Sequence, residues 1–296
     1  MLRVVYISIL VLLVSTSFGQ RTHWQNALAC YQEDSLVCAQ TEIDEAIADS
    51  SEGNLPYTWH LRAFIYRAVY KQIDKESPSS SARSKSIESF KKSLELDEGE
   101  EFKSNNIKGV EALAISFFND GIRYLNVFKP DEAISSLEKH NITMRLVNPS
   151  YYNQERETII KRKAGVIHMD RYNDDKHGNR ISFDRAIEYF NDVLQLDSND
   201  FIANLNSGVL YHNLAVDLLM ETKPELSLME VMELQEKHVN NMQRSLVFMT
   251  KANSISPNHP GVIRALAGAY FSLHDEKKFE YYNQKLLKLE GSHNDK

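Results

Sequence analysis

The amino-acid sequence predicts an all-α protein of about six antiparallel helix pairs that follow one another along the chain. Three observations predict this class. Glycine and proline, which strands and hairpin turns use heavily, number only 11 and 7 in 296 residues. Hydrophobic residues make up 42% of the chain and charged residues 25%, which is the balance of a folded protein. Small and bulky residues also recur at helical spacing over most of the length.

The N-terminus, residues 1–19, has the pattern of a secretory signal peptide. A basic residue stands near the start, residues 4–14 form an almost unbroken apolar run, and Ser17 and Gly19 are the small residues that a cleavage site requires. We expect cleavage before Gln20, no membrane span afterwards, and an exported chain that is periplasmic, envelope-associated or secreted. An uncleaved anchor is the alternative, but the apolar stretch is shorter than the roughly 20 residues that span a bilayer.

Cys30 and Cys38 are the two cysteines of the chain. They lie between two helical patterns, so both could stand near the open end of one helix pair. An exported protein meets an oxidising compartment, and a disulfide across so short a loop would contribute about 2.5 kcal/mol. Two buried thiols at a helix crossing are the alternative. Because the spacing matches no redox or zinc motif, we expect no catalytic or metal-binding role.

Residues 114–147 have the spacing of a helix-turn-helix unit of 34 residues. Gly121 and Ala133 are small, which lets two helices approach closely where they cross. Bulky residues fill the space around that crossing, at Phe117, Tyr124 and Leu137. Pro130 stands in the turn before the second helix, where its missing N–H costs little. The B-helix half of this pattern recurs with Phe90, Phe190 and Met249 at the place of Leu137.

These spacings resemble the tetratricopeptide repeat (TPR), whose small residues stand at position 8 of the first (A) helix and position 20 of the second (B) helix. The resemblance implies a right-handed superhelical solenoid whose concave groove is lined by the A helices. It covers a repeat domain at residues 20–290, is poor at both ends, and precedes a disordered tail at 291–296. The implied units are residues 22–49, 56–98, 114–147, 155–197, 201–257 and 260–290.

Three of these six units exceed 34 residues, which indicates insertions between A and B helices. We expect polar loops at residues 74–85 and 170–180, because both are rich in loop-forming side chains. After Pro224, apolar residues recur at helical spacing as far as Met249, which favours a B helix extended backwards. Insertions of this kind, with the Ser-Phe-Gly-Gln leader, resemble exported repeat proteins of the Bacteroidetes.

The sequence contains no recognisable catalytic motif. Nucleophile elbows, phosphate-binding glycine loops and paired zinc histidines are absent. Possible metal ligands crowd the segment 168–179, but Arg180 stands where a calcium loop carries an apolar residue, so we expect neither metal nor cofactor. A net charge of −7 without a basic block argues against nucleic acid as a partner. We therefore predict a non-enzymatic protein, with an unrecognised enzyme using this crowded segment as one alternative.

The resemblance implies a scaffold that binds a protein or peptide partner through positions 2, 5, 9, 12 and 13 of the A helices. Aromatic residues and arginine supply much of the binding energy in protein interfaces, and such a groove suits an extended or helical peptide. The assignment takes Ala164 as position 8 of the fourth unit. The candidate groove residues are Tyr57, His60, Phe64, Arg67, Phe118, Ile122, Lys161, His168, His212, Arg264 and Phe271.

Two further interpretations stay open. The long insertions could fill the groove and make these aromatic residues part of the core. A carbohydrate- or small-ligand-binding envelope protein, using Trp59 and its aromatic neighbours, is the alternative function. Five of the eight methionines also cluster within thirty residues, either as an adaptable surface or as core. They are Met220, Met229, Met232, Met242 and Met249.

Overall fold

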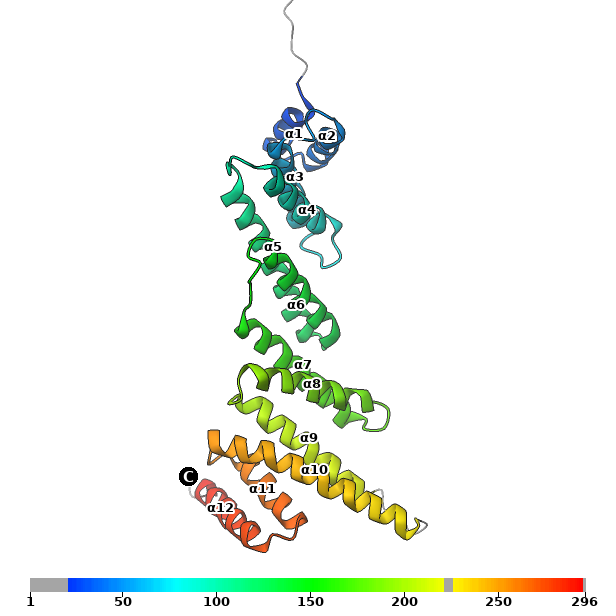
Figure 1. Ribbon diagram of the computed structural model, residues 1–296, viewed down its shortest axis with the longest axis vertical. Helices are drawn as coiled ribbons and strands as arrows, with labels where there is room; N and C mark the ends of the chain where they lie inside the picture. Colours follow the sequence, from blue (N-terminus) through cyan, green and yellow to red (C-terminus); the bar gives the residue numbers. More distant parts are fainter. Residues whose placement is uncertain (1–20, 221–225, 295–296) are drawn as a thin grey trace, which may run out of the picture. The chain divides into compact units, whose positions relative to one another are not determined.

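The computed structural model describes residues 21–220 and 226–294. Within these ranges the chain forms twelve α-helices and no β-strand (Figure 1), which confirms the predicted all-α class. None of the described helices combines the length and the apolar character needed to cross a membrane. The predicted signal peptide, residues 1–19, lies outside the described residues. The described chain divides into two compact units, one ending at Val110 and the other beginning at Glu111.

The first unit is made of two helix pairs and the start of a further helix. Its helices are α1 (His23–Gln32), α2 (Leu36–Ala48), α3 (Pro56–Ala68), α4 (Ser81–Leu96) and the first part of α5 (Lys103–Asn126). A single π-helical turn, η1 (Val69–Ile73), continues α3. Helix α1 packs on α2 and α3 packs on α4. Arg62 of α3 is buried, and its guanidinium donates to Asp44 of α2 (2.9 Å) and Ser89 of α4 (2.6 Å), which joins the two pairs.

The second unit continues the same pairing. After the rest of α5 come α6 (Pro130–Arg145), α7 (Gln154–Asp174), α8 (Arg180–Leu196), α9 (Phe201–Met220), α10 (Leu228–Ile255), α11 (Pro260–Ser272) and α12 (Glu276–Asn294). Its apolar clusters each join one pair to the A helix of the next. One of them contains Phe190 of α8 together with Ala203 and Leu210 of α9. Because each pair buries its apolar face only against a neighbour, the pairs depend on one another for stability.

The close helix crossing predicted at Gly121 and Ala133 is confirmed in the structure, and Gly208 marks a second one. A Cβ atom on Gly121 would lie 3.2 Å from the carbonyl oxygen of Ala133, and one on Gly208 would lie 2.8 Å from the Met249 side chain. The helices approach so closely that B-helix hydroxyls reach A-helix carbonyls. Ser245 donates to the Gly208 carbonyl (2.8 Å), and Ser86 of α4 donates to the Ala63 carbonyl of α3 (2.7 Å).

Three short A–B turns share one backbone device. A residue other than glycine stands in the left-handed region directly after the A helix, with φ near 58° at Asp34, 58° at Phe128 and 56° at His274. In each turn the next N–H reaches five residues back, as Lys129 does to the Tyr124 carbonyl (2.9 Å). This is the hydrogen bond of the Schellman motif, which satisfies carbonyls that the helix end leaves free.

Two predicted loops are shorter than the sequence suggests. The segment 74–85 is predicted to be a loop, but α4 begins at Ser81, after Ser80 as its N-cap. Arg83 is only 2% exposed and donates to the Pro78 carbonyl (2.8 Å), so it holds the remaining loop in place. In the segment 170–180, α7 continues to Asp174 and α8 begins at Arg180. Loop composition alone does not reveal these helix ends.

Two helix boundaries also differ from the predicted units, and a third is as predicted. Helix α5 begins at Lys103, well before residue 114. Just before it, the two carboxylate oxygens of Asp97 accept the backbone N–H groups of Glu101 and Phe102 (3.0 and 2.8 Å) and hold the chain that leads into the helix. Helix α12 continues to Asn294, so residues 291–294 are helical rather than a tail; no proline interrupts it. The backward extension of the fifth B helix is confirmed from Leu228 onwards.

Candidate functional site on the A helices

The predicted groove residues of the first unit form an aromatic cluster. Tyr57, His60 and Phe64 stand about one turn apart on α3, and Phe102, just before α5, lies against the first two. The ring centroids are 4.8 Å apart for His60 and Phe102, and 4.9 Å apart for His60 and Phe64. Phe64 also meets the buried ring of Phe90 edge-on at 5.2 Å. These rings pack against one another and are half-buried.

The imidazole of His60 in this cluster also has a hydrogen-bond partner within the first unit. His60 Nδ1 lies 2.7 Å from Asn106 Oδ1, so this nitrogen carries the proton and donates it. Burial lowers the pKa of His60, which keeps the imidazole neutral. Arg67, the fourth candidate of this helix, is partly exposed, and its Nε is buried without a hydrogen-bond partner among the described residues. In the first unit the aromatic candidates are therefore half-buried and pack mainly on one another.

Trp59, the residue named for a sugar-binding site, has partners within the first unit. Its indole N–H donates to the Gly53 carbonyl at 2.8 Å, and the guanidinium of Arg62 lies 5.6 Å from the centre of its ring. Both the polar edge of the indole and its ring thus have partners within the first unit.

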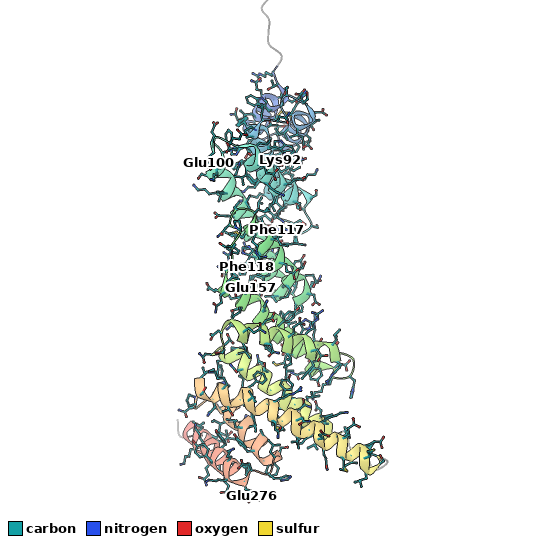
Figure 2. All side chains as sticks on the ribbon, in the orientation of Figure 1. Lys92, Glu100, Phe117, Phe118, Glu157 and Glu276 are labelled. Carbon is teal, nitrogen blue, oxygen red and sulfur yellow. A yellow bond between two sulfur atoms is a disulfide. The ribbon has the colours of Figure 1, made fainter. Side chains whose placement is uncertain are left out.

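Phe118 of α5, in the second unit (labelled in Figure 2), is half-buried beneath other side chains of that unit. The Arg156 guanidinium lies 5.0 Å from the centre of its ring, and His140 lies 5.9 Å away. His140 is fully buried: its Nδ1 donates to the Ala114 carbonyl (2.8 Å), while its Nε2 accepts from Arg156 (2.8 Å) and lies 2.9 Å from the Tyr151 hydroxyl. Burial lowers the pKa of His140, which fits this neutral tautomer.

An open hollow of about 280 Å³ lies on the A helices of the second unit. Its walls are aliphatic and come from three successive A helices: Ile122 of α5, Ile159 and Val166 of α7, and Ile202 of α9. Two cations border it. Arg162 is paired with Asp200 at 2.9 Å, whereas Lys163 is exposed. Ile122 is among the residues predicted from the sequence, but the others are not.

The α7 residues of the hollow are not predicted because the repeat positions are assigned one residue out of register in this helix. The sequence offers two adjacent small residues, Ala164 and Gly165, and the prediction takes Ala164 as position 8. In the structure a Cβ on Gly165 would lie 2.7 Å from Phe190 of α8, which is the contact that Gly208 makes with Met249. Gly165 is therefore the crossing residue.

With the corrected register, Lys161 and His168 move out of the groove. Lys161 faces its own B helix and pairs with Asp192 of α8 at 2.9 Å. His168 is 4% exposed and lies against Tyr189 of α8, with ring centroids 5.7 Å apart. The groove positions become those of Ile159, Arg162 and Val166, which are the residues that border the hollow.

The last three candidates lie on α9 and α11. His212 of α9 is half-buried against α11, where a Cβ on Gly268 would lie 3.2 Å from the ring. Arg264 is exposed and pairs with Glu290 of α12 at 2.7 Å. Phe271 is 65% exposed and lies beside Phe279 of α12. Arg264 and Phe271 stand on α11, the last A helix of the described residues.

A disulfide joins Cys30 of α1 to Cys38 of α2, with Cα atoms 5.8 Å apart. In residues 21–220 and 226–294 no three histidine, cysteine or acidic side chains gather closely enough to hold a metal ion. In the segment 168–179, which is crowded with possible ligands, Asp175 instead accepts the backbone N–H of Gly178 (2.9 Å). Its carboxylate thus shapes the turn between α7 and α8.

Comparison with known proteins gives similarity at the level of fold. No protein-family model matches the sequence, and no curated protein does. Similar solved structures include the human IFIT1 dimer with m7Gppp-AAAA, at 16% identity and a TM-score of 0.36, covering 88% of this chain and 58% of that one. PilW, a widely conserved type IV pilus biogenesis factor, is 16% identical with a TM-score of 0.33, covering 89% and 90%.

A tetratricopeptide repeat protein from Parabacteroides merdae is 13% identical with a TM-score of 0.24, covering 90% of this chain and 91% of that one. The present chain spans little more than half the length of IFIT1. The repeat assignment depends on the helix pairs themselves, on the crossings at Gly121, Gly165 and Gly208, and on the apolar clusters that join one pair to the next. By these features the chain has a tetratricopeptide-like helical repeat fold.

Proposed function

We propose that this protein is a non-enzymatic, exported scaffold that binds an extended segment of a partner polypeptide on the A helices of the second unit. The observation that carries the proposal is the aliphatic hollow shared by α5, α7 and α9. It is a concave surface built from successive repeats, and no side chain of the described residues fills it.

The size and chemistry of the hollow suit a side chain of a peptide. A volume of about 280 Å³ is at the small end of ligand pockets and is enough to receive one or two apolar side chains. Burying one large apolar side chain there would contribute roughly 1.5 to 3 kcal/mol. Lys163 at the border offers a cation for a carboxylate of the same segment. An apolar residue next to an acidic one is thus the expected recognition element.

Export is supported by the sequence of residues 1–19 and by the cysteine pair. A disulfide persists in oxidising compartments and is rare in reducing ones. The Cys30–Cys38 bridge in the structure is what an exported chain would carry.

The test is capture of the partner from the native cell envelope by the purified chain. The same capture is then measured with two matched variants. Ile202 in the hollow and Ile142 on α6 are both exposed isoleucines, at 38% and 61%. Ile202→Asp should abolish capture, because a carboxylate would replace the apolar wall. Ile142→Asp should leave capture intact, and both variants should keep the circular dichroism of the parent. Equal capture by the two variants would refute the groove as the binding surface.

A further inference from the structure

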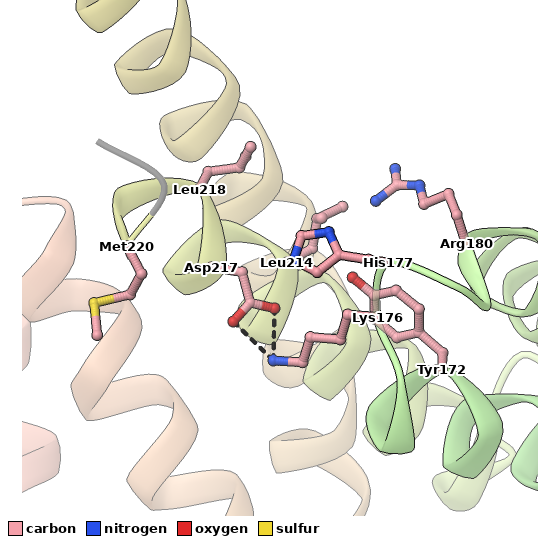
Figure 3. A pocket seen from close by; sticks show the side chains of 8 residues that line it. All are labelled: Tyr172, Lys176, His177, Arg180, Leu214, Asp217, Leu218 and Met220. Atoms are coloured by element: carbon pink, nitrogen blue, oxygen red, sulfur yellow. Dashed lines mark hydrogen bonds and ion pairs between the residues drawn. The ribbon is translucent and has the colours of Figure 1, made fainter. Parts of the chain in front are cut away.

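A second pocket of the second unit, separate from the hollow, carries cationic side chains. Its volume is about 490 Å³, and it lies between the α7–α8 turn and the C-terminal end of α9. The turn supplies Lys176, His177 and Arg180, and α9 supplies an apolar wall. Figure 3 shows the Arg180 guanidinium pointing from the start of α8 toward the side chains of α9.

The turn holds its shape through its own hydrogen bonds. Asn179 donates its backbone N–H to the Asp175 carbonyl (3.0 Å) and its side-chain amide to the Arg171 carbonyl (3.1 Å). A Cβ on Gly178 would lie 2.1 Å from the Asp175 carboxylate, so a larger residue there would displace this side chain from its hydrogen bond. The α7–α8 turn is thus an ordered wall that presents its basic side chains to the pocket. The Asp175 carboxylate is engaged within the turn, where it accepts the backbone N–H of Gly178.

The charge of the pocket is positive. Among the described residues that line it, Asp217 of α9 is the one carboxylate, and Lys176 contacts both of its oxygens at 2.7 Å (Figure 3). This ion pair ties the turn to α9 and neutralises Asp217. Arg180 and His177 then face the pocket with no lining carboxylate left for them. Arg180 rests beside the Phe183 ring, 5.1 Å from its centre, which keeps the guanidinium at the pocket.

The rest of the lining is apolar with one buried hydroxyl. Leu214, Leu218 and Met220 form the α9 wall, and Tyr172 of α7, which is 2% exposed, stands at the base. Burial raises the pKa of Tyr172, so its hydroxyl keeps the proton; the hydroxyl accepts a hydrogen bond from Arg180 and can donate its own proton to a ligand. Donors on one side and hydrocarbon on the other match a molecule that has one anionic end and an apolar body.

We propose that this pocket binds a small organic anion, with its carboxylate or phosphate held by Arg180, His177 and the Tyr172 hydroxyl and its body packed on Leu218 and Met220. Planar guanidinium groups hold such oxyanions through paired, charge-assisted hydrogen bonds. The pocket is large enough for a ring or a short alkyl chain in addition to the anion.

Calorimetric titration of the full chain with phenyl phosphate tests the proposal, with inorganic phosphate and benzyl alcohol as partial probes. Phenyl phosphate should bind saturably, and each partial probe should bind at least roughly tenfold more weakly, because it lacks either the body or the charge. Absence of saturable binding, or equal binding of inorganic phosphate, would overturn the proposal.

Variants then assign the binding to this pocket. Arg180→Gln should weaken phenyl phosphate binding roughly tenfold. Met220→Asp should weaken it as well, and because this side chain is 83% exposed the fold should be unaffected. Arg185→Gln is the matched control, since Arg185 lies on the same helix but pairs with Glu188 (3.4 Å). Loss of binding in the control, or unchanged binding in both pocket variants, would contradict the assignment.

Discussion

The A helices of the two units carry the same repeat positions but use them differently. On α3 these positions hold Tyr57, His60 and Phe64, whose rings pack on one another and on Phe102. On α5, α7 and α9 several of these positions hold aliphatic side chains, Ile122, Val166 and Ile202 among them, that border an open hollow. Large rings fill the surface that a repeat fold leaves concave, whereas smaller branched side chains leave room. The difference shows that an aromatic residue at a groove position can be core, and that the open surface lies where side chains are smaller.

The largest expected effect tests the packed aromatic cluster of α3, formed by Tyr57, His60, Phe64 and Phe102. Phe64→Ala should destabilise the first unit by about 3 kcal/mol, because the ring is packed between His60 and Phe90. Val166→Ala, at the equivalent position of α7, should cost only about 1 kcal/mol, since the side chain borders the hollow. Urea unfolding measures both. Both tryptophans, Trp24 and Trp59, lie in the first unit, so fluorescence reports that unit while circular dichroism reports both. Equal costs would break the comparison.

The second largest effect is expected from the disulfide, which also belongs to the first unit. Replacing Cys30 and Cys38 by alanine should lower the free energy of unfolding of that unit by about 2.5 kcal/mol, through the greater entropy of the unfolded chain. Tryptophan fluorescence during urea unfolding measures it, and addition of reductant to the parent protein should have the same effect. Two alkylatable thiols in the untreated native protein would show that the bridge is absent.

Each unit also has a neutral histidine held by burial, and these predict how stability depends on pH. The folded pKa values of His60 and His140 lie below the ordinary value of 6.5, mainly because of burial. Below that value the unfolded chain takes up protons that the folded chain does not, so stability should be full above about pH 7.5 and fall as pH drops through about 6.5. Thermal melting from about pH 8 to about pH 5 measures this fall. His140→Gln should reduce its slope in circular dichroism but not in tryptophan fluorescence; an unchanged slope by both would contradict the assignment.

The smallest effect concerns the turn that follows α5. Phe128 is 67% exposed and adopts φ near 58°, a region in which a bulky residue is strained. Phe128→Gly should stabilise the second unit by roughly 0.5 to 1 kcal/mol, since relief of the strain exceeds the added entropy of the unfolded chain. Thermal melting by circular dichroism measures the gain. A loss of stability instead would show that the Phe128 ring contributes packing.

The helix pairs could be predicted from the sequence because their signal is local. Small residues such as Gly121 and Ala133 recur at fixed distances from bulky ones, and close crossing requires them. The register of α7 could not be predicted, since Ala164 and Gly165 are both small and only the partner Phe190 distinguishes them. The packing of the α3 aromatic cluster could not be predicted either, because Phe102, which lies against Tyr57 and His60, stands outside the repeat pattern.

The uneven use of methionine gives this protein an internal reporter. Met242 and Met249 are fully buried, whereas Met220, Met229 and Met232 are 83%, 81% and 61% exposed at the end of the long α9–α10 pair, which extends beyond its neighbours (Figure 1). Dilute peroxide should therefore convert the three outer thioethers to sulfoxides and spare the two inner ones while the fold persists. Mass spectrometry of the peptides would then register, without any label, whether a binding partner shields this end of the molecule.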